Sequence, residues 1–183
     1  TGAVSFNRLW LCHPRTGACR DQGQLPPDRQ FNGLTFLPGG LFMESRDVLV
    51  GIESGGTWRK LNITPSGVNT IVLGSYANEQ SSGDAFSIEG VGTYAAVTRE
   101  GVASDIIVEV NPLDPSDLQD IAVLDGYDNV FGVAGWRGEL FAFDASGAVL
   151  RVDLTTNEVS VIFSQDEAWW GAGVSSVIYS APE

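Results

Sequence analysis

The side chains best suited to binding are tryptophans that lie beside glycines near expected turns: Trp136 and the adjacent pair Trp169 and Trp170. Successive strand residues point to opposite faces of a sheet, so one core cannot hold both members of that pair. An exposed indole ring beside polar oxygens is a common sugar-binding surface, because the ring packs on C–H groups while the oxygens bind hydroxyls. Asp84 and Asn129, which precede expected strands, complete the predicted ligand site. The alternative for each tryptophan is packing between sheets.

A second group of interest is the segment Asp125-Gly126-Tyr127-Asp128-Asn129. Carboxylate and amide oxygens are the ligands that Ca²⁺ prefers, so Asp125 and Asp128 are candidate calcium ligands. The segment does not match an EF-hand loop. Since Asp and Asn also favour turns without any ion, an ordinary turn is the competing interpretation.

Catalytic motifs are poorly represented. His13 is the only histidine, and there is no G-x-S-x-G sequence to supply a serine nucleophile. Carboxylates are abundant, so an acid/base pair of a hydrolase or lyase stays open as an alternative function. Because no catalytic motif is present, we expect a binding module rather than an enzyme.

The two cysteines, Cys12 and Cys19, flank a segment with turn residues at Pro14 and Thr16-Gly17. A hairpin there would place them opposite each other, and we predict a disulfide. Disulfides persist in oxidising compartments, which predicts a secreted or periplasmic protein. The alternatives are two free thiols, or a metal site that two cysteines and one histidine would leave one ligand short.

The chain is strongly acidic, with 23 Asp and Glu against 10 Lys and Arg and a net charge of −13. This excess repels phosphate backbones, so we expect no nucleic-acid partner. No apolar run approaches the ~20 residues of a membrane-spanning helix. The expected partners are carbohydrate or protein ligands, and the sequence leaves the oligomeric state open.

These side chains must be positioned by short strands, because apolar residues alternate or form short runs that Gly, Pro, Asn, Asp and Ser interrupt. The sequence therefore predicts an all-β chain. A single helical turn is expected only around Pro115–Gln119, where Asp114-Pro115-Ser116 could begin it.

Three segments share a four-strand layout: Leu34–Leu73, Phe86–Leu124 and Phe131–Phe163. Their first apolar residues lie 52 and 45 positions apart, and the longer interval contains an expected loop insertion at Pro38–Ser45. Such intervals are typical of propeller blades. Strands before Leu34 and one at Val174–Tyr179 would complete a fourth blade. We predict one domain over residues 1–183, a four-bladed β-propeller whose N- and C-terminal strands share one blade. A piece of a larger propeller and a β-sandwich are the alternatives.

The turn and strand pattern Asp144-x-x-Gly147-x-x-x-x-Val152-Asp153-x-x-Thr156 resembles the repeat of many secreted bacterial β-propellers. Leu11-Cys12-His13-Pro14-Arg15-Thr16-Gly17 is similar to its later half. The resemblance implies a fold and no particular activity. The predicted function is a secreted ligand-binding module of lectin type. A hydrolase or lyase, or a structural module of a larger assembly, are the alternatives.

Overall fold

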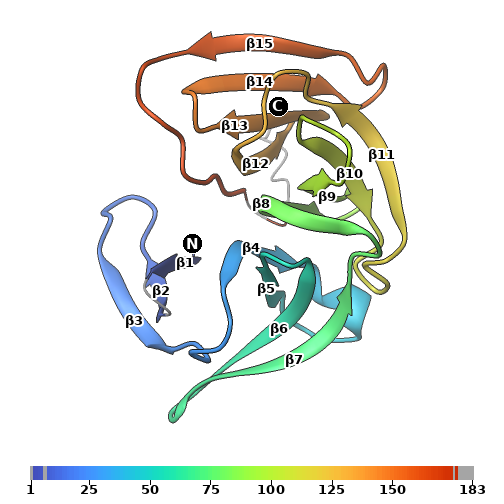
Figure 1. Cartoon of the computed structure of the whole chain (residues 1–183). Helices are drawn as coiled ribbons and strands as arrows, with labels where there is room; N and C mark the ends of the chain where they lie inside the picture. The colour runs from blue at the N-terminus through green and yellow to red at the C-terminus, as the bar shows by residue number, and fades with distance from the viewer. Residues whose placement is uncertain (1, 6–7, 175, 177–183) are drawn as a thin grey trace, which may run out of the picture.

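A computed structural model describes residues 2–5, 8–174 and 176 of the chain (Figure 1). These residues form fifteen strands and one short 3-10 helix. The strands make four antiparallel sheets, which Figure 1 shows arranged around a common centre. The protein is a four-bladed β-propeller.

The blades follow one another along the chain. Blade 1 has three strands: β1 (Gly2–Ser5), β2 (Arg8–Cys12) and β3 (Cys19–Gln24). Blade 2 has four: β4 (Phe31–Leu37), β5 (Val48–Glu53), β6 (Thr57–Thr64) and β7 (Gly67–Ser75), with helix η1 (Gly39–Phe42) between the first two. Blade 3 has β8 (Glu79–Ile88), β9 (Gly92–Arg99), β10 (Ile106–Val110) and β11 (Leu118–Val123). Blade 4 has β12 (Val130–Trp136), β13 (Glu139–Asp144), β14 (Ala148–Asp153) and β15 (Val159–Ser164).

Hydrophobic packing between neighbouring blades forms the core. Blade 3 shows the reason in its sequence: Ile106 and Val108 pack towards blade 2, while Ile107 between them packs towards blade 4. A strand buried on both faces needs apolar residues at consecutive positions, as β10 has. A smaller cluster around Leu9 and Leu61 joins blades 1 and 2. The described residues form no comparable cluster between blades 4 and 1.

The structure confirms the predicted fold class, and the three repeated segments correspond to blades 2, 3 and 4. Blade 3 begins earlier than predicted, because β8 begins at Glu79 and not at Phe86. In blade 1, β2 and β3 lie where strands were expected, and β1 is an additional strand. The strand predicted at residues 174–179 falls mostly on positions outside those described.

The helical turn expected at Pro115–Gln119 is wrong, because β11 already begins at Leu118. Asp114 does not cap a helix. Its Oδ1 accepts hydrogen bonds from the backbone N–H and the hydroxyl of Ser116, at 3.2 and 2.6 Å, which closes a turn instead. The only helical turn in the described residues is η1, which ends at Met43 in the left-handed conformation.

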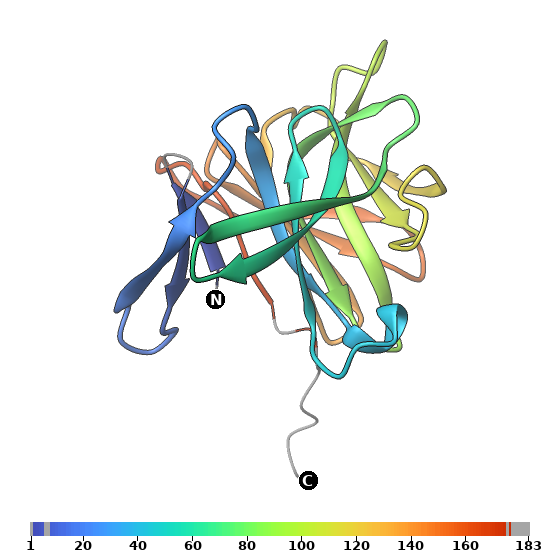
Figure 2. The same cartoon turned by 90° about the horizontal axis from the view of Figure 1, so that it is seen from below.

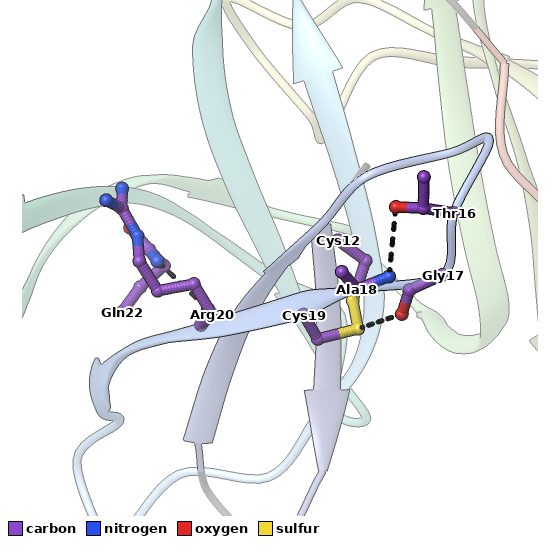
Figure 3. The surroundings of a disulfide bond; sticks show 7 residues. All are labelled: Cys12, Thr16, Gly17, Ala18, Cys19, Arg20 and Gln22. Atoms are coloured by element: carbon purple, nitrogen blue, oxygen red, sulfur yellow. Dashed lines mark hydrogen bonds between the residues drawn. A yellow bond between two sulfur atoms is a disulfide. The ribbon is translucent and has the colours of Figure 1, made fainter.

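The disulfide between Cys12 and Cys19 is confirmed. The two residues are direct partners at the end of the β2–β3 ladder, so the hairpin itself brings the sulfurs together (Figure 3). Within the turn, the N–H of Ala18 bonds to the Thr16 hydroxyl at 3.4 Å. The β2–β3 hairpin projects at the left edge of the molecule in Figure 2.

None of the helical segments in the part of the chain that is described has the length and hydropathy needed to cross a membrane.

Candidate functional site

The innermost strands of blades 2, 3 and 4 are β4, β8 and β12, and they approach one another closely at glycines. A Cβ atom added to Gly33 of β4 would lie 2.5 Å from the Gly83 oxygen, and one added to Gly83 of β8 would lie 2.5 Å from the Val130 oxygen. One added to Gly132 of β12 would lie 2.6 Å from the backbone N of Ala172. Only glycine allows backbones to approach so closely. The stretch around Ala172 therefore takes the fourth inner position, after β4, β8 and β12.

Asp84 holds this C-terminal stretch in place. Its pairing in β8 is irregular between Ser81 and Ala85, and its carboxylate bonds away from β9. Oδ1 accepts a hydrogen bond from the backbone N–H of Leu34, and Oδ2 accepts one from Ala172, each at 3.1 Å. Burial raises the pKa of Asp84 to about 7, although both backbone hydrogen bonds favour the charged form.

Asp105 connects blades 3 and 4 by hydrogen bonds in a similar way. It is fully buried, and its Oδ2 accepts hydrogen bonds from the Ser82 hydroxyl at 2.5 Å and the Val130 N–H at 2.8 Å. Burial raises the pKa of this carboxyl group as well, and the nearby Asp128 and Asp144 add to the effect. A carboxyl group so deeply enclosed can connect strands but cannot meet a substrate.

The segment from Asp125 to Asn129 is a turn fixed by its neighbours. The Tyr127 oxygen accepts the N–H of Asp105 at 2.8 Å, and the Asn129 N–H donates to Asp144 Oδ2 at 3.2 Å. Asp125 and Asp128, the candidate calcium ligands, are both exposed. The described residues contain no group of three or more His, Cys, Asp or Glu side chains arranged to hold a metal ion.

The three candidate tryptophans have different surroundings. Trp170 is 77% exposed, and one face of its ring is stacked on Phe131, with 5.3 Å between centroids and 11° between planes. Trp169 is half-buried: its ring meets Phe143 edge-on, and its Nε1 donates to the Gly147 oxygen at 3.1 Å. The two rings thus have separate partners, although Trp169 and Trp170 lie after the end of β15 and outside any strand.

Trp136 lies elsewhere. It is the last residue of β12, whereas Phe131 is near the beginning of that strand, so roughly 17 Å of extended chain separates them. Trp136 is 61% exposed, and the Arg137 guanidinium lies 5.6 Å from its ring centroid. Trp136 therefore cannot share a small ligand with Trp170.

Among the predicted site residues, Trp170, Asp84 and Asn129 are grouped at the end of the axis where β12 begins. Asp84 bonds to Ala172, two residues after Trp170, and the exposed Asn129 lies two residues before Phe131. The Asn129 side-chain amide donates to Asp128 Oδ1 at 2.7 Å. We call the stacked pair of Trp170 and Phe131 the aromatic platform. Phe131 was not among the predicted site residues, because the sequence indicated only that a strand begins there.

Comparison with known proteins supplies no family: no family model and no curated protein matches the chain. Solved structures do resemble it. AztD of Citrobacter koseri is 12% identical with a TM-score of 0.46, covering 92% of this chain and 46% of AztD. The tricorn protease is 14% identical (TM-score 0.48; 88% of this chain, 15% of the protease). The WD40 domain of SCAP from fission yeast is 16% identical (TM-score 0.43; 91% and 42%). The chain spans less than half the length of each, and these likenesses concern the sheet architecture alone.

Proposed function

We propose that this protein is a secreted or periplasmic ligand-binding module, a single propeller domain whose aromatic platform binds a neutral carbohydrate. The observation that carries the proposal is the geometry of Trp170. Its ring is mostly open to solvent, yet Phe131 supports one face and the bond from Ala172 to Asp84 anchors the backbone two residues away. A rigid, exposed aromatic face is what a sugar ring requires, because binding then orders few side chains.

Polar groups beside the platform suit hydroxyl recognition. Asn129 and Asp128 are exposed at the start of β12 and offer amide and carboxylate oxygens. The net charge of −13 favours a neutral sugar over an acidic one, since a carboxylated or sulfated glycan would be repelled. The disulfide at the β2–β3 hairpin supports an oxidising compartment.

The same geometry argues against the hydrolase or lyase alternative. A pKa near 7 would suit Asp84 as an acid catalyst, but both of its oxygens already accept backbone hydrogen bonds. Asp105, the other axial carboxyl group with a raised pKa, is fully buried. A pair of accessible carboxyl groups, which glycoside hydrolysis requires, is not formed by these two residues.

A panel of neutral trisaccharides built from glucose, mannose, galactose or N-acetylglucosamine tests the proposal. We expect at least one to bind, and Trp170→Ala to weaken that binding at least about tenfold. Trp136→Ala is the matched control, because it removes an equally large exposed ring at the other end of β12. The proposal fails if no member binds, or if the two variants weaken binding equally.

A further inference from the structure

A groove of about 600 Å³ lies between blades 2 and 3, away from the aromatic platform. One wall comes from the segment around η1, and the other from the β8–β9 turn and the β10–β11 loop. Pro38, Leu41, Val91 and Pro112 give these walls apolar surface. The volume is in the range of small-molecule sites.

The charged residues that line the groove are all acidic. Glu89, Glu109 and Asp117 line it, and no Lys, Arg or His does. The ion pairs formed by the described residues all lie elsewhere and include none of these three carboxylates. Glu109 is half-buried, so its charge is poorly screened by solvent. Uncompensated negative charge in a concave site attracts cations.

The floor of the groove holds two buried hydroxyl groups. Ser87 and Thr93 are each 3% exposed, line the groove, and place their hydroxyl oxygens 2.8 Å apart. Two hydroxyl groups carry two protons, and the bond between them uses one. The oxygens of the pair also keep free lone pairs, which can accept a hydrogen bond from a ligand N–H. A polar ligand in the groove would complete the pair.

We propose that this groove binds an aliphatic polyamine. The ammonium groups would pair with Glu89, Glu109 and Asp117, and the methylene chain between them would pack on the apolar walls. An ammonium N–H would donate a hydrogen bond to a free lone pair of the Ser87 or Thr93 hydroxyl oxygen. Phosphates and other anions are excluded by charge.

Calorimetric titration of the intact protein with spermidine at low ionic strength tests this proposal. We expect one molecule per chain, and binding that weakens as salt is added. Glu109→Gln should weaken binding roughly tenfold or more, because it removes a charge-assisted hydrogen bond. Asp125→Asn is the matched control: it removes one exposed carboxylate outside the groove and should change the affinity by less than about twofold.

Ser87→Ala provides a second variant that leaves the net charge unchanged and should still weaken binding. The proposal is overturned if spermidine does not bind, if several molecules bind per chain, or if Asp125→Asn weakens binding as much as Glu109→Gln does. Binding of a lysine-rich peptide without binding of spermidine would also overturn it, since the site would then serve a protein partner. Trp170→Ala should leave spermidine binding unchanged, which keeps this test separate from that of the aromatic platform.

Discussion

Asp84 accepts a hydrogen bond from the backbone N–H of Ala172, 88 residues further along the chain. The other oxygen of the same carboxyl group bonds to Leu34 in blade 2. One side chain of β8 therefore connects the inner strand of blade 2 to the stretch that carries Trp170. The position of the proposed ligand site depends on this connection.

Stability should fall as pH rises from about 4 to 7, because Asp84 titrates in that window. Its pKa is 3.8 in the unfolded chain and about 7 in the fold. Between these values the folded protein holds a proton that the unfolded chain has lost, so rising pH favours unfolding. The full effect is on the order of 4 kcal/mol. Urea unfolding at pH 5 and pH 8 should show roughly 2–3 kcal/mol of it, because the unfolded carboxyl group is already ionised at pH 5.

Asp84→Asn is the control for that measurement, since it removes the titration and keeps one acceptor oxygen. The variant should lose less stability than the wild type between the two pH values. Asp105, whose pKa is also raised, contributes with the same sign in both proteins. Equal losses in wild type and variant would contradict the role given to Asp84.

Gly83→Ala should destabilise the protein by roughly 1–3 kcal/mol. The new Cβ would lie 2.5 Å from the Val130 oxygen and 2.6 Å from the Phe131 oxygen, so β8 and β12 would have to separate. Gly55→Ala is the matched control, because nothing lies within 4 Å of a Cβ at that position. Thermal unfolding of the two variants compares them, and equal melting temperatures would argue against close contact of the inner strands.

Much of the propeller could be predicted because strand alternation and turn residues are local features. Blade 4 shows this best: Leu140 and Ala142 alternate with partly exposed neighbours, and Asp144 begins the turn that follows. The first half of β8 was not predicted, since Glu79-Gln80-Ser81-Ser82-Gly83 is polar. Its conformation depends instead on another blade: the Asn32 side chain donates to the Ser81 oxygen at 2.9 Å.

The candidate site was predictable only in part. Adjacent tryptophans on an extended chain must separate, which identified Trp170 as a residue to consider. The hydrogen bond between Asp84 and Ala172 could not be predicted from neighbouring residues in the sequence, because only the fold brings these distant residues together. The acidic groove was missed for the same reason: Leu41, Glu89 and Asp117 belong to three separate segments.

The disulfide should contribute at most about 2–3 kcal/mol, because it closes a loop with a sequence separation of only 7. Replacing both Cys12 and Cys19 by alanine should lower the urea midpoint accordingly. A reducing agent should lower the midpoint of the wild type to a similar value and leave the double variant unchanged. A double variant as stable as the oxidised wild type would contradict this prediction.

The aromatic platform is tested most directly by the indole N–H signals in a nitrogen–proton NMR spectrum, assigned by single Trp→Phe substitutions. Each neutral trisaccharide is added at millimolar concentration. A sugar stacked on the open face of Trp170 should shift the Trp170 signal strongly and leave that of Trp136, at the far end of β12, in place. An unmoved Trp170 signal with every sugar, or a larger shift at Trp136 than at Trp170, would contradict the account.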